Sequence, residues 1–285
     1  VWNHGSFVDR LQSAWFDAHQ ALWPREVATL PVTVVEIDQK SLKELGQWPW
    51  PRNLLARLVR IIQRAEPAAI GVNILMPEAD ALSPERLLAQ SQVENLALAE
   101  ALRALPTHDS QLARALSQAP AVLVVAGTAE PTPHALRAAP VTVHGSGNTP
   151  VPEYPGALTS IDELNASANG WGLISTESSR GVIRRMPTVA SIGGTLVPSL
   201  ALEMLRVAQQ APSLRLDVSD GAVDSVGAGR LRVPTEPDGT VRVYFSRHLT
   251  QRFVSAVDVL DGRVLEADLR GQLVLIGLTG VALQE

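Results

Sequence analysis

Two apolar runs that flank an amphipathic stretch dominate the pattern of residues 31–76. Residues 31–38 (PVTVVEID) predict a strand that ends at Asp38, and residues 68–76 (AAIGVNILM) predict a strand that is covered on both faces. Between them, residues 51–65 predict a helix on a sheet, because apolar positions recur at helical spacing opposite polar and arginine positions. Its expected apolar face consists of Leu54, Leu58, Ile61, Ile62 and Ala65. This order of elements predicts a right-handed βαβ unit.

A short helix and a stiff corner connect the first strand to this helix. Asp38 is the expected N-cap of a helix that stops at Gly46. Residues 45–52 (LGQWPWPR) follow, and each residue before a proline is restricted to an extended conformation. We expect the corner to aim the long helix over the sheet. The indoles of Trp48 and Trp50 either cap the edge of the core or face a partner, and the structural role is favoured.

The middle of the chain changes from helical to proline-punctuated. Residues 84–119 predict two helices broken near residues 105–109, and residues 120–127 (PAVLVVAG) predict a third buried strand. Six prolines then interrupt residues 128–159, so we expect a long loop that is largely irregular and exposed.

The C-terminal half is rich in short strand patterns. Residues 170–176 and 181–194 predict a hairpin that turns near Ser179 and Gly181, and residues 196–211 predict a helix. Four short strands should follow in residues 214–245, with turns at Asp220-Gly221 and Asp238-Gly239. A short helix in residues 254–262 and a core strand in residues 271–280 complete the prediction.

An amphipathic helix is predicted before all of these elements. Ser6 and Asp9 have the spacing of a capping box, and Pro24 ends the helix. One side carries Phe7, Leu11, Trp15 and Leu22. This aromatic side is typical of a helix at a membrane interface or against a partner helix, and packing on its own domain is an equal alternative. The predicted fold class is therefore mixed α/β, with a mainly parallel core sheet flanked by helices, a β-rich C-terminal part and an N-terminal amphipathic helix.

Composition narrows the function classes. A formal net charge of −5 and a pI near 5.7 argue against a nucleic-acid partner, which would need a basic stripe. The chain has no cysteine, which excludes disulfides and thiolate chemistry. No stretch reaches the roughly 18 apolar residues of a membrane helix. Because the chain begins at Val1, we expect a processed product or a fragment whose flanking membrane helices were removed.

Sequence motifs for phosphate loops, histidine-built zinc sites and serine nucleophiles are missing. One candidate constellation remains, because successive parallel strands end at the same edge of a sheet, where open α/β sheets bind ligands. Asp38, Asn73, Glu78 and Asp80 should converge there, and the three carboxylates Asp38, Glu78 and Asp80 are candidate ligands of calcium or magnesium. The favoured alternative makes Asp38 an N-cap and the other two acids solvated loop residues.

Three tryptophan and arginine positions complete the candidate ligand-binding set. It consists of Asp38, Trp48, Trp50, Arg52, Asn73, Glu78 and Asp80. Arg52 enters the long helix beside the strand ends and is an equally suitable partner for Asp38, which would leave no room for a metal. Arg184 and Arg185 should point to opposite faces of a strand. One of them is a candidate for binding an acidic group, but surface charges or one structural ion pair are the favoured interpretation.

Several segments, in order along the chain, resemble the CHASE2 family. The matching pieces are VVEIDQKSLKELGQWPWPRNLLARLV (34–59), PAAIGVNILMPEAD (67–80), GLISTESSRGVIRRMPTV (172–189), VPSLALEML (197–205), FVSAVDVL (253–260) and LRGQLVLIGLTG (269–280). The first piece is the specific one. The chain departs from the family pattern at Asn73, at Arg180 and at Glu285, where aspartates are usual or the sequence usually continues. Losing a carboxylate and gaining a cation weakens the hypothesis of an acidic site.

The resemblance implies the extracytoplasmic, periplasmic sensor of a bacterial inner-membrane receptor. Residues 1–27 would be a membrane-proximal helix, and residues 28–285 the sensory domain with the proline-rich loop 128–159. Its partners would be its own transmembrane helices and a cytoplasmic cyclase, diguanylate cyclase or kinase module. A homodimer seam is expected along Phe7, Leu11, Trp15 and Leu22, and the stimulus is an unidentified small molecule or protein.

Two other functions compete with the sensor. One is a metal-dependent hydrolase built on Asp38, Glu78 and Asp80. The other is a module that recognises a periplasmic protein through loop 128–159.

Overall fold

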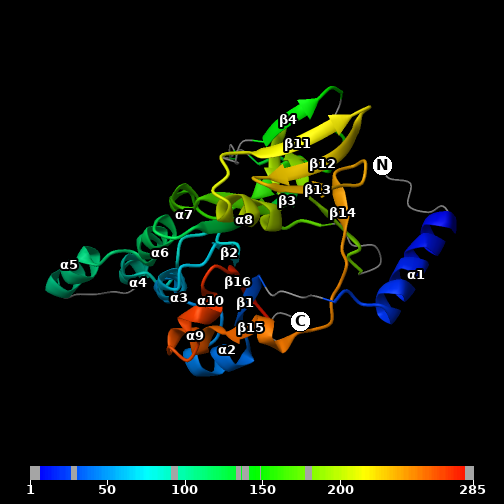
Figure 1. The fold of residues 1–285 in the computed structure, drawn as a ribbon. Coiled ribbons are helices and arrows are strands. Elements are labelled where there is room, and N and C mark those ends of the chain that lie inside the picture. Colours follow the sequence, from blue (N-terminus) through cyan, green and yellow to red (C-terminus); the bar gives the residue numbers. More distant parts are fainter. Residues whose placement is uncertain are drawn as a thin grey trace.

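The computed structural model of the protein describes residues 7–26, 31–90, 96–132, 136, 141–147, 149–176 and 182–279. Its centre is a sheet in the strand order β15-β1-β16-β2-β3-β6, with β7 also paired to β3 (Figure 1). These strands are β15 (Phe253–Ser255), β1 (Val32–Ile37), β16 (Leu273–Leu278), β2 (Ala69–Asn73), β3 (Ala121–Thr128), β6 (Gly156–Leu158) and β7 (Gly170–Leu173). All pairs in it are parallel except β3 with β6, which confirms the mainly parallel core sheet.

The last strand of the fold lies between the first two. β1 and β2 are parallel members of one sheet, as expected of a βαβ unit, yet β16 pairs with both of them. The carboxyl ends of β1 and β2 are therefore one strand further apart than direct neighbours would be.

Helices cover both faces of this sheet. On one face, Val35, Ile37, Ile70 and Ile276 share a core with the helices, and on the other face Met204 packs with Ala69 and Val122. The first group of helices comprises α2 (Gln39–Leu45), α3 (Arg52–Arg64), α6 (His108–Ser117), α7 (Asp162–Ser167), α9 (Ala256–Leu260) and α10 (Glu266–Leu269). The second face is covered by α8 (Leu200–Ala208).

The buried face of α3 is wider than the sequence suggested. Leu58 and Ile62 are buried as expected, but Leu55, Ala56 and Val59 are buried too. Leu54 and Ile61 are only partly buried. The reason is that α3 packs against α6 and α9 as well as against the sheet, so three neighbours cover it instead of one.

Residues 84–119 form more helices than predicted. The break near residues 105–109 is present, and Thr107 caps α6 through the backbone N–H of Ser110 at 2.9 Å. Before it, however, the structure has α4 (Pro84–Gln90) and α5 (Leu96–Ala104), with residues 91–95 outside the described part. α5 projects from the body of the molecule, and α4 lies between it and α3 (Figure 1).

The proline-rich segment 128–159 contains strands and is not simply an exposed loop. It holds β4 (Val141–Gly145), β5 (Glu153–Tyr154) and β6, while residues 133–135, 137–140 and 148 lie outside the described part. Val151 and Ala157 are buried. The prediction failed because these strands pair with partners distant in sequence, namely β11, β9 and β3.

The hairpin predicted around Ser179 and Gly181 is wrong. β7 pairs with β3, whereas β8 (Arg185–Pro187) pairs with β14 (Thr240–Arg242), and β9 (Val189–Ile192) pairs with β10 (Thr195–Pro198). Ser179 and Gly181 themselves lie outside the described residues.

The β-rich C-terminal part is confirmed. β11 (Leu214–Ser219), β12 (Ala222–Ala228) and β13 (Leu231–Pro234) form a sheet with β4. Asp220 (φ 50°) and Gly221 (φ 75°) form its first hairpin turn as predicted. The Asp238-Gly239 turn is also present, but β13 and β14, on either side of it, pair with other strands.

The predicted N-terminal helix is present as α1 (Phe7–Leu22) and lies at the side of the molecule (Figure 1). Ser6, the predicted cap, lies outside the described residues. None of the helices in the described ranges combines the length and apolarity that crossing a membrane requires.

Candidate functional site

A row of aligned residues crosses the main sheet near its carboxyl edge. The strand register places Ser255 beside Glu36, Glu36 beside Gly277, and Gly277 beside Asn73. Neighbouring strands are about 4.8 Å apart, so Glu36 and Asn73 are separated by roughly 10 Å across a residue without a side chain. A Cβ placed on Gly277 would lie 3.9 Å from the Cβ of Asn73. The row thus offers a carboxylate and an amide on either side of a gap.

Asn73 is exposed and Glu36 partly exposed, so both polar groups are accessible. Sequence reasoning identified Asn73 but missed Glu36 and Gly277. Glu36 could have been found, because strand alternation places it on the face opposite Val35 and Ile37. Gly277 could not, since its position depends on β16 entering between β1 and β2.

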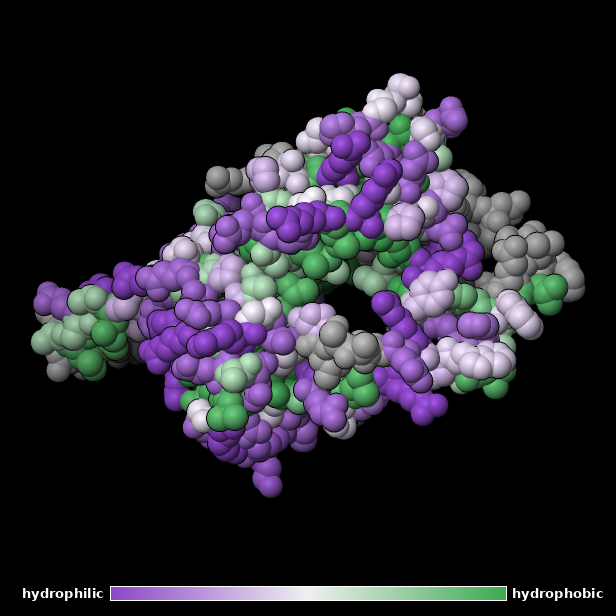
Figure 2. All heavy atoms as spheres, in the orientation of Figure 1, coloured by the Kyte–Doolittle hydropathy of each residue, from purple (hydrophilic) through white to green (hydrophobic). Residues whose placement is uncertain are grey.

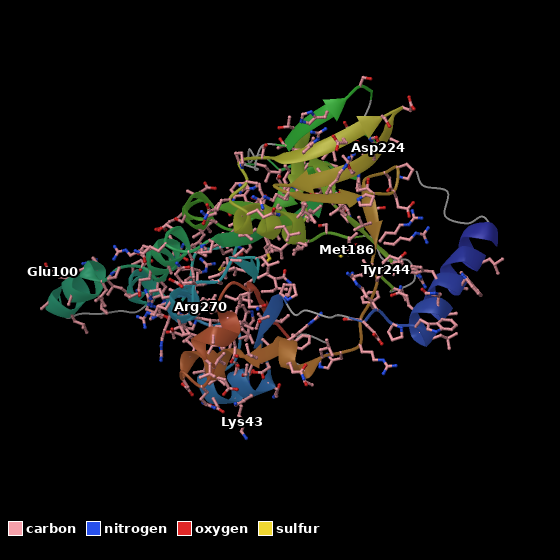
Figure 3. The ribbon with its side chains drawn as sticks, in the orientation of Figure 1. Lys43, Glu100, Met186, Asp224, Tyr244 and Arg270 are labelled. Carbon is pink, nitrogen blue, oxygen red and sulfur yellow. The ribbon has the colours of Figure 1, made fainter. Side chains whose placement is uncertain are left out.

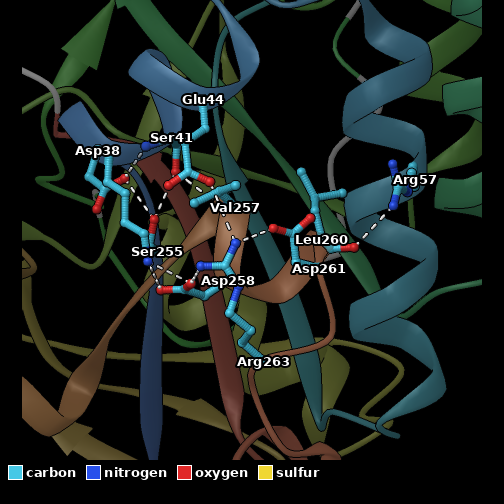
Figure 4. A network of polar contacts seen from close by, with 11 residues as sticks. Asp38, Ser41, Glu44, Arg57, Ser255, Val257, Asp258, Leu260, Asp261 and Arg263 are labelled. Carbon is cyan, nitrogen blue, oxygen red and sulfur yellow. Dashed lines mark hydrogen bonds and ion pairs between the residues drawn. The ribbon is translucent and has the colours of Figure 1, made fainter.

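Asp38 is a helix cap that also joins two distant parts of the chain. Its Oδ1 accepts hydrogen bonds from the backbone N–H of Ser41 and the hydroxyl of Ser255, both at 2.8 Å (Figure 4). The hydroxyls of Ser41 and Ser255 are 2.9 Å apart, and the N–H of Val257 donates to Ser41 Oγ at 3.1 Å. This cap fastens α2 to the start of α9 and confirms the structural interpretation of Asp38.

The pKa of Asp38 reflects these bonds. Burial, the largest effect, raises it, but the hydrogen bonds from Ser41 and Ser255 together outweigh burial and hold it below its ordinary value. Asp258 of α9 forms two ion pairs near this cap, with Lys40 of α2 and with Arg263, each at 2.7 Å.

Arg52 does not pair with Asp38, contrary to the alternative considered from sequence. It is buried, and its guanidinium donates to a carboxylate oxygen of Asp109 and to the backbone carbonyl of Glu78. Asp109 also accepts a hydrogen bond from the backbone N–H of Asp80 at 3.0 Å. Asp109 was outside the predicted set because it lies 57 residues from Arg52 along the chain.

Asp80 is the centre of this second network. Its carboxylate accepts from the backbone N–H of Arg52 at 2.8 Å and of Leu82 at 2.9 Å, and it contacts His108 Nδ1 at 2.9 Å. Burial raises the pKa of Asp80, yet these hydrogen bonds and the attraction of His108 outweigh burial and lower the pKa overall. The network joins the start of α3 to the start of α6, so Asp80 is a buried structural residue and not the solvated loop acid that was expected.

The structure does not bring Asp38, Glu78 and Asp80 together as a metal site. Asp38 binds two serines, Asp80 binds α3 and α6, and the Glu78 side chain is exposed. Among the described residues, no group of three or more His, Cys, Asp or Glu could hold a metal ion. The physical reason is the position of β16, which separates the ends of β1 and β2.

The corner at residues 45–52 is largely structural. Trp50 is buried and donates a hydrogen bond from Nε1 to the carbonyl of Gly46 at 2.9 Å. The ring of Trp48 lies 6.2 Å from that of Trp50 and packs against the core while remaining partly exposed, and the bond between Trp48 and Pro49 is cis. Of the two indoles, Trp48 therefore keeps a surface that a ligand can reach.

α1 contacts the body through one side, by polar and aromatic contacts. Asp17 pairs with Arg184 at 2.6 Å, which is the structural ion pair expected for one of the two adjacent arginines. The hydrogen bond from Arg184 is the main cause that lowers the pKa of Asp17. Beside it, the ring of Phe16 meets Tyr244 edge to face at 5.3 Å (Figure 3 labels Tyr244 beside α1). Gln20 accepts from the N–H of Phe245 at 2.7 Å.

The other side of α1 exposes large apolar side chains. Leu11, Trp15 and Leu22, three members of the predicted seam, are 61%, 73% and 68% exposed. The side chain of the fourth, Phe7, lies outside the described part of the structure.

Comparison with known proteins gives one match. A protein-family model described as the CHASE2 domain matches residues 1–285, the whole chain. Neither the curated proteins nor the solved structures contain a significant match.

Proposed function

The chain belongs to the CHASE2 family of extracytoplasmic sensory domains, and from this premise we propose that it is the sensor of a membrane-anchored bacterial receptor. In that receptor the domain lies in the periplasm. Membrane helices of the same polypeptide lead to a cytoplasmic cyclase, diguanylate cyclase or kinase module. The domain recognises a stimulus and performs no chemical step itself.

The observation that carries this proposal is that α1 docks on the body through a small set of polar and aromatic contacts. Asp17 and Arg184 keep side-chain exposures of 42% and 24%, and an exposed ion pair of this kind contributes about 0.2–1 kcal/mol. The edge-to-face contact of Phe16 with Tyr244 adds about 0.5–1.5 kcal/mol.

Gln20 adds two hydrogen bonds, to the carbonyl of Val243 at 3.2 Å and from the N–H of Phe245 at 2.7 Å, each worth about 0.5–1.5 kcal/mol. The guanidinium of Arg242 lies 5.6 Å from the centre of the Phe16 ring, which adds about 0.5–1 kcal/mol. Undocking α1 therefore costs several kcal/mol. α1 can therefore be docked or undocked. A ligand that binds one of these two states more tightly, by a comparable free energy, can shift the population between them.

The stimulus binds, in this proposal, at the carboxyl edge of the main sheet. Glu36 and Asn73 flank the gap at Gly277 and offer hydrogen-bond acceptors to a small molecule with hydroxyl or amine groups. The residue after β16, Thr279, donates to the carbonyl of Ile37 at 3.2 Å. An occupant of this edge therefore lies close to the last described residues of the chain, which favours coupling to segments that follow.

The exposed side of α1 is the proposed contact between two receptor copies. Leu11, Trp15 and Leu22 are spaced by four and seven residues, which places them along one stripe of the helix. Burying that stripe against its own copy would remove three large apolar side chains from water. Because this dimer contact lies on the same helix as the contacts with the body, a stimulus that moves α1 would also change the dimer interface.

Native mass spectrometry of the purified chain tests the stimulus site. The wild-type chain is expected to retain a small molecule, and Glu36→Gln is expected to lose it, because the acceptor charge is removed without a change in size. Glu153→Gln is the matched control, since Glu153 is an exposed glutamate on β5. Asp38→Asn, which alters a cap, should not abolish retention. A wild-type chain without added mass, or equal retention in Glu36→Gln, would contradict binding at this edge.

A further inference from the structure

The outer face of the small C-terminal sheet carries an arrangement that neither the strand-end row nor α1 explains. In β11, Leu214 and Leu216 point into the core, so Arg215 and Asp217 alternate onto the outer face. The register pairs Arg215 with Gly227 of β12, and Gly227 with Arg232 of β13. A glycine therefore separates two arginines in one cross-strand row.

This row lies in a hollow of about 460 Å³. Its described ionisable lining consists of three arginines, Arg215, Arg230 and Arg232, and one aspartate, Asp217, which is an excess of two positive charges. The chain as a whole carries a net charge of −5, so the hollow is basic within an acidic protein. Strongly hydrophilic side chains gather over this sheet (Figure 2). The acidic residue Asp224, labelled in Figure 3, lies near the start of β12, whereas Gly227 and the hollow lie near its end.

Asp217 braces two of the arginines and leaves donors free. Arg215 Nε donates to Asp217 at 2.6 Å, and Arg232 approaches Asp217 at 3.3 Å. Ser225 donates to Asp217 at 3.0 Å and accepts from Arg232 Nε at 2.8 Å. Among the described residues, the terminal Nη groups of Arg215 and the whole guanidinium of Arg230 make no hydrogen bond or ion pair. Asp217 and Ser225 thus hold Arg215 and Arg232 in place, while guanidinium donors of Arg215 and Arg230 stay unused.

We propose that this hollow binds a phosphate group. Guanidinium forks match phosphate oxygens two at a time, and an excess of two positive charges complements a phosphate dianion. Gly227 leaves room between Arg215 and Arg232 for a tetrahedral group, and Arg230 on the adjoining hairpin supplies the third guanidinium. The phosphate belongs either to a soluble compound or to the headgroup of a phospholipid.

Calorimetric titration of the purified chain with inorganic phosphate, at constant ionic strength, tests the site. We expect saturable binding that Arg230→Ala weakens at least tenfold. The described contacts of Arg230 are made by its backbone N–H, which donates to Gln209 at 2.9 Å, so the fold should be retained. Arg60→Ala, an exposed arginine on α3, is the matched control and should bind as the wild type does. Equal circular dichroism melts would verify that both variants fold.

A second arm separates the two sources of phosphate. Co-sedimentation with phosphatidylglycerol vesicles, compared with phosphatidylcholine vesicles, reports on a lipid headgroup. Binding to inorganic phosphate that depends on Arg230 supports a soluble ligand, and Arg230-dependent binding to phosphatidylglycerol vesicles alone supports a headgroup. The proposal is overturned if neither probe binds, or if Arg60→Ala loses as much affinity as Arg230→Ala.

Discussion

Replacing Arg52 with methionine should destabilise the domain strongly, although Arg52 lies at the entrance of a helix. The change keeps most of the aliphatic stem and removes the guanidinium. The side chains of Arg52 and Asp109 are only 10% and 6% exposed, so water cannot replace the lost partner. Asp109 would keep a single described hydrogen bond, from the N–H of Asp80, and the carbonyl of Glu78 would lose its donor.

The structure sets the expected magnitude. Breaking a buried ion pair by removing one partner costs about 3–5 kcal/mol. The remaining hydrogen bond to Asp109 places Arg52→Met near the lower end, at about 3 kcal/mol. Arg60→Met on the same helix removes an exposed arginine, and its effect should stay within about 0.5 kcal/mol.

Urea unfolding at pH 7, followed by circular dichroism, measures these free energies. The slope of the free energy with urea should be unchanged, because the same surface is exposed on unfolding. Asp109→Asn and the double variant complete a cycle, in which Arg52→Met should cost at least about 1 kcal/mol less when Asp109 is already neutral. A loss below about 0.5 kcal/mol for Arg52→Met, or a coupling energy of zero, would show that the buried ion pair of Arg52 and Asp109 does not stabilise the fold.

Three further results are expected. Trp50→Ala should lower the unfolding free energy by about 3–5 kcal/mol, because it leaves a cavity, whereas Trp48→Ala should cost less; equal urea midpoints for the two would contradict this. Because the pKa of Asp80 is lowered in the folded state, its stabilising contribution is present above the unfolded pKa of about 3.9 and is lost as the pH falls through the folded value. The unfolding free energy should therefore fall less between pH 7 and pH 2 in Asp80→Asn than in the wild type. Equal falls in the two proteins would contradict a lowered pKa of Asp80 in the folded state. Trp15→Glu should reduce self-association in sedimentation velocity, and an unchanged sedimentation coefficient would remove the α1 seam.

Local features of the fold could be predicted from the sequence because their causes are local. The cap at Asp38, the stop at Gly46 and the turn at Asp220-Gly221 depend on residues a few positions apart. Apolar runs and helical spacing likewise located α3 and the core strands β1, β2, β3, β7 and β16, but not β6 and β15.

The candidate site could be predicted only in part, because strand order is a long-range property. Asn73 was found, but its neighbour Gly277 lies on the final strand, and nothing in residues 31–76 indicates that this strand enters between the first two. Because β16 lies between β1 and β2, Asp38 and Asp80 are separated, and the expected cluster of three carboxylates does not form. The partner of Arg52 was missed for an equivalent reason, since Asp109 belongs to a helix beyond α4 and α5.

The central claim is that the domain transmits its state through the docking of α1, and a charge exchange tests it most directly. The measurement is the output activity of the intact receptor carrying Asp17→Arg, Arg184→Asp, or both. Each single change should alter the basal output, because it places like charges together where a 2.6 Å ion pair stood. The double change should restore the wild-type level, because the pair is re-formed with its charges reversed. Equal output from all four receptors would contradict the claim.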